Sequence, residues 1–248
     1  TVSIASGVTV TDDNRFEADE TLQLTLSAPS GASLGAQTVY THTIINDEVA
    51  RVHANPTTNS TNESITPYNA RFTLTIVGTT VGTLVSDLAV DFTVSGIELG
   101  AGPTHALDPE DFTASASTFT FPIGSLSGDF VNVPVAIVND DVDEQNESFD
   151  VKLATVTNAI LPPDGDLTYD NSQTVTILDN DMAGYLVNTG ATTNITEPNI
   201  ATTFTIRLMS QPAGTVVLDF ASTDITECSV TPASFTFDNL NWNVAQTI

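Results

Sequence analysis

Acidic residues gather in two short stretches of this chain, and an alternating pattern of apolar residues follows each stretch at once. The segment 139–149 contains one group, and a second acidic segment, 179–181, follows later in the sequence. The segment 12–22 contains the corresponding group near the start of the sequence, and the acidic segment 46–48 follows it. Several carboxylates held close together form the oxygen-rich ligand set that hard divalent cations prefer. The two groups therefore predict metal sites.

The composition limits the possible partners. The chain has 31 acidic and 5 basic residues, a net charge of −26, which argues against nucleic acid and anionic membranes because both require basic residues. With 40% apolar residues the chain is expected to fold rather than to form an acidic tail. No apolar run approaches the length of a membrane span, so no membrane insertion is predicted. The single cysteine, Cys228, allows no intrachain disulfide and is expected to be buried or half-buried.

Apolar residues alternate with Thr and Ser, which predicts an all-β chain without significant helix. Residues 49–182 contain seven expected strands, at 50–54, 69–77, 87–94, 117–122, 129–138, 147–155 and 173–179. Residues 1–48 contain three more, at 7–11, 20–28 and 38–45, and match the second half of that pattern. Residues 183–248 match the first half, since the run 204–206 resembles 72–74 and 234–237 resembles 118–121.

This repetition predicts tandem antiparallel β-sandwiches. We expect a C-terminal half repeat at 1–48, a complete repeat at 49–182 and an N-terminal half repeat at 183–248. The partial repeats suggest a segment cut from a longer polypeptide.

If the seven strands of the complete repeat alternate in direction, the links after the first, third and fifth strands share one rim with the end of the seventh. Glu147 lies two residues before the core-facing Phe149, and Asp179 lies two residues after the core-facing Ile177. Both side chains should therefore point to the core side of their strands, at the open end of the sandwich. Carboxylates about 4 Å apart repel by about 4 kcal/mol at an effective dielectric near 20, so they need protons or a cation. The oxygen-only set favours calcium. The candidate ligands at this rim are Glu63, Asp111, Asp140, Asp141, Glu144, Glu147, Asp179 and Asp181.

The half repeats contain parts of the same pattern. The opening half supplies a second candidate calcium cluster, made of Asp12, Asp13, Glu17, Glu20, Asp47 and Glu48. In the closing half, Glu197 and Glu227 match Glu63 and Asp111 by their spacing to the Phe-Thr-Phe strand, and are candidate ligands of a further site.

Two motifs resemble the Calx-β family, which occurs in tandem in large extracellular and adhesin-type proteins. They are the acidic loop 139–149 and the segment 176–184, which contains Asp179-Asn180-Asp181. The resemblance implies an immunoglobulin-like sandwich that binds calcium at one end, with these matched ligands: Glu63, Asp111, Asp140, Glu144, Glu147, Asp179 and Asp181. The chain departs from the family at Asn139 and Asn180, where calcium-binding members often have Asp. The stretch 96–110 resembles an insertion.

Less specific interpretations remain open. The acidic groups could form a solvated rim of a salt-adapted protein. No hydrolase, metalloprotease or phosphate-binding motif occurs, so we expect no enzyme, although a glycosidase with paired carboxylates is conceivable. His42 aligns with Val175 and is expected to pack in the core of its repeat.

The sequence favours a structural segment of a long extracellular repeat protein, of adhesin, fibre or matrix type, with calcium at the joints between domains. Its partners would be neighbouring repeats or neighbouring copies in a fibre. One alternative is a calcium-sensing regulatory module. Another is a filament subunit in which the half repeats of two copies complete each other by strand complementation.

Overall fold

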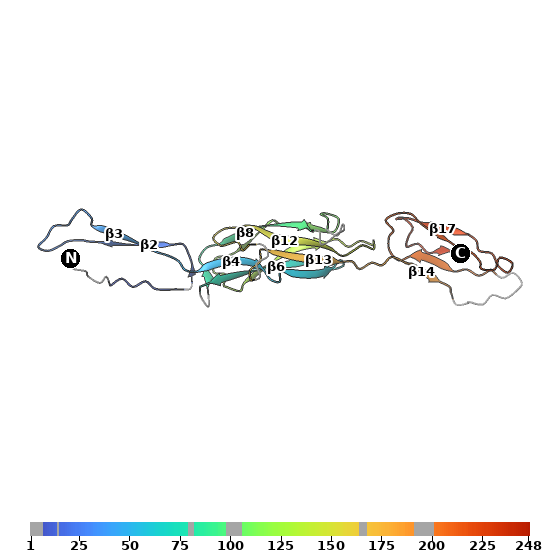
Figure 1. Ribbon diagram of the computed structural model, residues 1–248, viewed down its shortest axis with the longest axis horizontal. Helices are drawn as coiled ribbons and strands as arrows, with labels where there is room; N and C mark the ends of the chain where they lie inside the picture. Colours follow the sequence, from blue (N-terminus) through green and yellow to red (C-terminus); the bar gives the residue numbers. More distant parts are fainter. Residues whose placement is uncertain (1–6, 14, 79–81, 98–105, 164–167, 191–200) are drawn as a thin grey trace.

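The computed structural model describes residues 7–13, 15–78, 82–97, 106–163, 168–190 and 201–248, and every regular element in these ranges is a β-strand. The all-β prediction is therefore confirmed. Figure 1 shows the strands in three groups along one long axis: an opening hairpin, a larger central sandwich and a smaller closing unit. Within the described residues no helix has the length and apolar character needed to cross a bilayer.

The central sandwich consists of two sheets that enclose one apolar core. The four-stranded sheet has the order β4 (Val49–Ala54), β6 (Tyr68–Val77), β11 (Phe130–Ile137), β9 (Phe112–Ala114). The five-stranded sheet has the order β10 (Thr118–Phe121), β8 (Leu88–Gly96), β12 (Glu147–Val156), β13 (Ser172–Leu178), β5 (Thr58–Asn62).

The alternating residues of β12 and β13 face the core as their parity predicts. Phe149 and Val151 are 0% exposed, and Val175 on the neighbouring strand is also 0% exposed. The two strands pair antiparallel, with Glu147 opposite Ile177, so both strands bring their acidic ends to the same rim. The expected convergence of strand ends at one mouth of the sandwich is confirmed.

The sequence analysis missed two strands of these sheets, the short edge strand β9 and the strand β5. Residues 58–62 fall in a segment expected to be a link, but they form β5, which pairs parallel with β13 at the edge of the second sheet. The chain passes from β4 in one sheet to β5 in the other across Pro56, which has no N–H for a ladder. Gln173, 0% exposed, fixes this crossing: its side-chain amide donates to the Pro56 carbonyl and its Oε1 accepts a hydrogen bond from the Tyr68 hydroxyl.

The opening hairpin is formed by β2 (Glu20–Thr25) and β3 (Val39–Ile44), close to the predicted strands 20–28 and 38–45. The prediction of a strand at 7–11 is wrong, because the described residues 7–13 are not in a strand. The prediction that His42 packs in a core is also wrong, since His42 is exposed. Both errors have one cause: among the described residues no second sheet faces this hairpin, so its inward side chains are left exposed.

The closing unit has a small core of its own around Phe237 and Trp242. Its strands form a sheet with the order β14 (Tyr185–Asn188), β15 (Thr205–Leu208), β18 (Gln246–Thr247), and a pair of β16 (Val216–Asp219) with β17 (Ser234–Phe237). The expectation that Cys228 is at least half-buried is wrong, because it is exposed on the link between β16 and β17.

Candidate metal centre

The rim of the central sandwich contains a small cavity lined mainly by carboxylates. Its volume is about 10 Å³, close to the room that one water molecule needs. Its acidic lining residues come from links that are distant in the sequence: Glu63, Asp111, Glu144, Glu147 and Asp179. The strand topology therefore brings five of the eight predicted ligands around one space.

Asp181 joins this group through its neighbours. One carboxylate oxygen each of Glu63, Asp179 and Asp181 lies within 4.8 Å of the other two, a separation at which one ion can contact all three. Glu63 Oε2 and Asp181 Oδ2 are buried and accept no hydrogen bond from the described part of the protein. Because buried polar atoms are almost always paired, two unpaired carboxylate oxygens at one place make this a candidate cation site.

Backbone N–H groups hold the acidic loop in position. Asp179 Oδ2 accepts a hydrogen bond from the N–H of Glu144 at 3.3 Å, and Asp179 Oδ1 accepts one from the N–H of Asp181 at 3.3 Å. Glu63 Oε1 accepts a hydrogen bond from the N–H of Asp140 at 3.1 Å. On the link between β8 and β9, Asp111 Oδ2 accepts a hydrogen bond from the N–H of Leu107 at 2.6 Å. Glu63 thus keeps Oε1 on the backbone, while its Oε2 accepts no hydrogen bond from the described residues, whereas both oxygens of Asp179 accept backbone hydrogen bonds.

Asp140 and Asp141 are not among the residues that line the cavity. Asp140 Oδ1 accepts a hydrogen bond from the N–H of Val142 at 2.7 Å, a local turn that shapes the loop. The two asparagines that depart from the family pattern contact each other, since Asn180 Nδ2 donates to Asn139 Oδ1 at 2.7 Å. An amide pair therefore stands where two further carboxylates would add negative charge, and this lowers the charge of the rim.

One residue that the sequence analysis did not identify as part of the site supports it directly. Asn146 Oδ1 accepts a hydrogen bond from the N–H of Asp179 at 3.1 Å. In the opening cluster, Asp19 Oδ1 accepts one from the N–H of Asn46 at 3.0 Å. Asp19 precedes Glu20 as Asn146 precedes Glu147. The short polar residue before the glutamate in both copies was a signal that could have revealed this contact.

The opening cluster is only partly assembled. Asp12, Asp47 and Glu48 each place a carboxylate oxygen within 4.8 Å of the other two. Burial raises the pKa of Glu48, and the nearby charges of Asp47, Asp12 and Asp13 add to this. Glu17 and Glu20 belong to no such group among the described residues.

The closing unit gathers no acidic cluster among its described residues. Glu227 is exposed on the link between β16 and β17. Glu197 lies outside the described residues. The assignment of metal ligands in all three places stays a prediction.

Burial and mutual repulsion raise the pKa of the carboxyl groups at the central rim. Burial is the largest cause for Glu63, Glu144 and Asp181, and the charges of neighbouring acids such as Asp140 and Asp179 add to it. The pKa of Glu147 is raised to about 8 by burial, by its hydrogen bond with Asp111 and by the nearby charges. At neutral pH a rim of this kind holds protons or exchanges them for a cation.

The raised pKa of Glu147 predicts how the metal-free protein responds to pH. The folded protein holds this proton up to about pH 8, whereas the unfolded chain releases it near pH 4.3. Stability therefore falls as the pH rises from 6.5 to 8. The titration of His53 does not interfere in this window, because burial lowers the pKa of His53 below its ordinary value of 6.5. We expect the thermal midpoint in chelator to fall across this window.

The control for this experiment is the Glu147→Gln variant, which carries no titrating group at that position and should show a flatter profile. A thermal midpoint of the unsubstituted protein that rises between pH 6.5 and 8 in chelator would contradict the assignment.

The fold and the rim define a protein of tandem β-sandwiches in which carboxylates gather at one end of the complete sandwich. The sequence profile of the Calx-beta domain matches residues 2–58 and 60–181, and the chain belongs to the Calx-beta family. The two matched segments meet within β5, about ten residues after the predicted domain boundary between 48 and 49. The predicted division of the chain into repeats stays a prediction.

Solved structures resemble this chain at low identity. The apo-form Calx CBD1 domain is 20% identical, with a TM-score of 0.41, covering 54% of this chain and 99% of that one. CBD12 from CALX1.2 is 20% identical, with a TM-score of 0.42, covering 80% and 73%. The calcium binding domain CBD12 of CALX1.1 is 19% identical, with a TM-score of 0.41, covering 80% and 74%. No curated protein matches.

Proposed function

We propose that this chain is a structural segment of a long extracellular repeat protein, in which calcium binds at the rims and stiffens the joints between successive β-sandwiches. The observation that carries the proposal is the position of the two acidic clusters. Each cluster lies where one repeat meets the next, and each acidic loop also contacts the following repeat. An ion bound there can act on the joint as well as on the fold of its own repeat.

At the first joint, the acidic loop of the opening unit pairs with the central sandwich. The short strand β1 (Arg15–Phe16) runs parallel to β7 (Thr83–Leu84). Gly78, at the end of β6, lies against the acidic segment 46–48: its φ is +107°, and a Cβ on it would meet the Asp47 carbonyl oxygen at 3.0 Å. Only glycine permits this close approach without strain.

The second joint repeats this arrangement. The N–H of Gln211 in the closing unit donates to the Asp141 carbonyl at 2.6 Å, and Val142 and Gln211 form a parallel bridge. A hollow of about 290 Å³ remains beside this contact, lined by residues of both units such as Asp143 and Tyr185. The acidic loop therefore takes part directly in this joint, and a change in its conformation would act on the contact with the closing unit.

Calcium suits the central rim for three reasons. The donors are oxygens only, two buried carboxylate oxygens have no hydrogen-bond partner among the described residues, and the cavity has room for one ion. Bound calcium would neutralise carboxylates that otherwise repel one another. Domains of this family with solved structures include one described as a calcium binding domain. Sites in extracellular modules have dissociation constants on the order of 10⁻⁴–10⁻³ M, which fits a rim whose charge is lowered by the Asn139–Asn180 pair.

Small-angle scattering tests the stiffening. In calcium we expect a maximum dimension close to that of the extended arrangement in Figure 1. In chelator we expect a broader distribution of distances, because the carboxylates repel and loosen the loop that forms the joint. The Asp179→Asn variant should behave in calcium as the unsubstituted protein does in chelator. The matched control is Asp219→Asn, which removes an exposed acid far from the rim.

Identical scattering curves in calcium and chelator would refute the stiffening. Titration calorimetry addresses the alternative of a regulatory sensor. A micromolar dissociation constant would favour sensing, whereas a constant near the millimolar range would favour a structural role in a calcium-rich extracellular medium.

A further inference from the structure

The four-stranded sheet of the central sandwich differs in charge from the rest of the chain. The chain has 31 acidic and 5 basic residues, yet none of the strands β4, β6, β11 and β9 contains an acid. Two of the five basic residues, Arg51 on β4 and Arg71 on β6, lie on the outer face of this sheet, because the next residues, Val52 and Phe72, are 0% exposed in the core. The five-stranded sheet has acids on β8 and β12. The outer face of the four-stranded sheet is therefore a basic area on an acidic chain.

An aromatic ring holds each of these arginines in place. The guanidinium carbon of Arg71 lies 3.7 Å from the centroid of the Phe130 ring, and that of Arg51 lies 5.1 Å from the centroid of the Tyr169 ring. The His53 ring meets Tyr169 edge-on with centroids 5.0 Å apart, which fixes Tyr169 over β4. A guanidinium stacked on a ring keeps the N–H groups at its edge available, and these groups match the two oxygens of a carboxylate.

No carboxylate of the described residues neutralises the two arginines. Arg51 Nε is buried and has no hydrogen-bond partner in the described part of the chain. The acids that flank this face are engaged in their own loops, since Asp129 Oδ2 accepts a hydrogen bond from the N–H of Leu126 at 2.8 Å. In the same way, Asp170 Oδ1 accepts one from the N–H of Ser172 at 3.1 Å. The positive charge of this face is therefore available to an anion from outside the chain.

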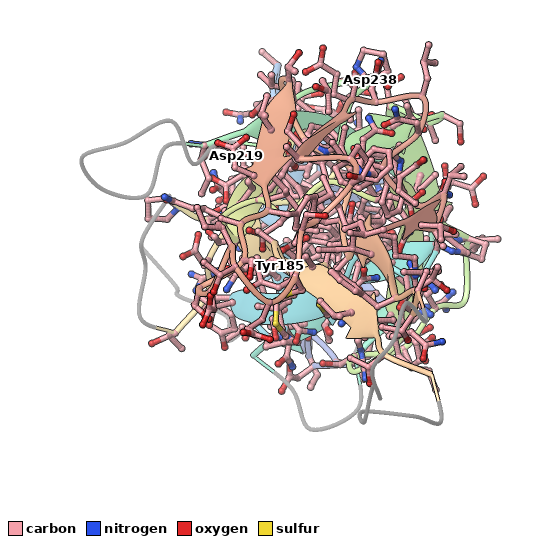
Figure 2. All side chains as sticks on the ribbon, turned by 90° about the vertical axis from the view of Figure 1, so that its right-hand side faces the viewer. Tyr185, Asp219 and Asp238 are labelled. Atoms are coloured by element: carbon pink, nitrogen blue, oxygen red, sulfur yellow. The ribbon has the colours of Figure 1, made fainter. Side chains whose placement is uncertain are left out.

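The closing unit repeats this distribution of charge. Its strand β15 is equivalent to β6, and Arg207 on β15 occupies the position of Thr75 on β6. None of the strands β14, β15 and β18 contains an acid. Figure 2 looks onto this unit along the long axis, and Tyr185 of β14 lies below Asp219 and Asp238, which belong to the ends of β16 and β17. In both units the equivalent sheet contains arginine and no acid.

We propose that the outer face of the four-stranded sheet binds an acidic polysaccharide whose carboxylates are widely spaced along its chain. Arg51 pairs with Thr75, which lies four residues from Arg71 along β6. The two arginines are thus attached roughly 13 Å apart along the strands, at about 3.3 Å per residue. Phe130, 48% exposed, and the half-buried Tyr169 offer apolar surface to the C–H groups of sugar rings beside the two charges.

The surrounding charge favours a sparsely charged ligand over a densely charged one. Acidic segments lie beyond both ends of the sheet, since 46–48 precedes β4 and 139–141 follows β11. DNA, with one negative charge per about 1.7 Å of its axis, would bring many phosphates against these acids. A polysaccharide with one carboxylate per disaccharide can contact the arginines and bring little further charge. Neither arginine lines the carboxylate cavity at the rim, so this binding does not depend on the proposed calcium site.

Titration calorimetry of the 248-residue chain with a hyaluronan octasaccharide, which has one carboxylate per disaccharide, tests the proposal. At about 0.15 M sodium chloride, where charges interact over about 8 Å, we expect a dissociation constant of about 1 mM, because only two arginines make charge-assisted contacts. A neutral maltooligosaccharide of the same length should not bind. Absence of binding by the octasaccharide at about five times that constant would overturn the proposal.

Substitutions on the two sheets locate the binding face. Arg71→Gln should lower the affinity about fivefold or more, because it removes a charged donor pair. Arg71→Lys keeps the charge but loses the planar stack on Phe130, and should recover only part of the affinity. The matched control is Lys152→Gln, which removes a basic side chain from the outer face of the other sheet and should leave the affinity unchanged. Equal losses in Arg71→Gln and Lys152→Gln would overturn the site, because net charge alone would then govern binding.

Two further titrations separate this face from the calcium rim and from a protein ligand. The affinity ratio between the unsubstituted chain and Arg71→Gln should be the same in calcium and in chelator. Loss of all octasaccharide binding in chelator would show that calcium bridges the carboxylates at the rim, and would overturn the proposal. A polyglutamate peptide with the same number of carboxylates should bind more weakly than the octasaccharide. Equal binding of the peptide would overturn the assignment of a carbohydrate ligand.

Discussion

Replacing Glu63 with glutamine is expected to have opposite effects on the metal-free and the calcium-bound protein. Glu63 Oε1 accepts the hydrogen bond from the Asp140 N–H, and glutamine can keep this contact through its own Oε1. The replacement removes a buried charge whose pKa is raised by burial first, and then by Asp140, Asp179 and Asp181. In chelator at pH 8 the thermal midpoint should rise, because the repulsion at the rim is weaker.

In calcium the same variant should lose affinity by about tenfold or more, because a charged ligand is replaced by a neutral one. Titration calorimetry measures the affinity and differential scanning fluorimetry measures the midpoint. The control is Glu227→Gln, an exposed site on the closing unit, which should change neither the central affinity nor the midpoint in chelator. A lower midpoint in chelator with unchanged affinity would mean that Glu63 has only a structural role.

Replacing Phe149 with alanine is expected to cause the largest loss of stability. Phe149 is 0% exposed, and its ring stacks on that of Phe112 with centroids 5.0 Å apart and planes 25° apart. Removal of a fully buried phenylalanine costs about 3–5 kcal/mol in lost transfer energy and cavity formation. Chemical denaturation should therefore show a much lower midpoint. Ile123→Ala, at a side chain that is 63% exposed, should shift the free energy of unfolding by no more than about 0.5 kcal/mol.

The same substitution should weaken calcium binding, although Phe149 itself would contact no ion. Phe149 follows Glu147 by two residues and Phe112 follows Asp111 directly, so their stack positions two candidate ligands from different links. A Phe149→Ala protein with reduced stability but unchanged calcium affinity, measured well below its unfolding midpoint, would contradict this coupling.

The site could be predicted to a large extent because strand parity is a local property. The alternation through Phe149 and Val151 placed Glu147 on the core side, and the alternation through Val175 and Ile177 placed Asp179 there as well. Both side chains line the same cavity. The alternation of strand directions along the chain also predicted that the links with Glu63 and Asp111 lie at that rim.

Strand β5 could not be predicted in the same way. Its residues, Thr58 to Asn62, are all polar, so they have no apolar alternation, and their strand conformation depends on the ladder with β13. That partner lies more than a hundred positions further along the sequence. The hydrogen bonds of Gln173 at the crossing between the sheets have the same long-range origin.

The amino-acid pattern alone determined the all-β class, the repeat and the sorting of acids to one end, because alternation and repetition are properties of neighbouring residues. Tertiary structure decided which carboxylates share a cavity, that Asn139 and Asn180 bond to each other, and that Leu24, Tyr40 and His42 are exposed. An apolar face is buried only when a second sheet covers it. The opening hairpin has the sequence pattern of a sandwich strand pair, but no opposing sheet covers it among the described residues.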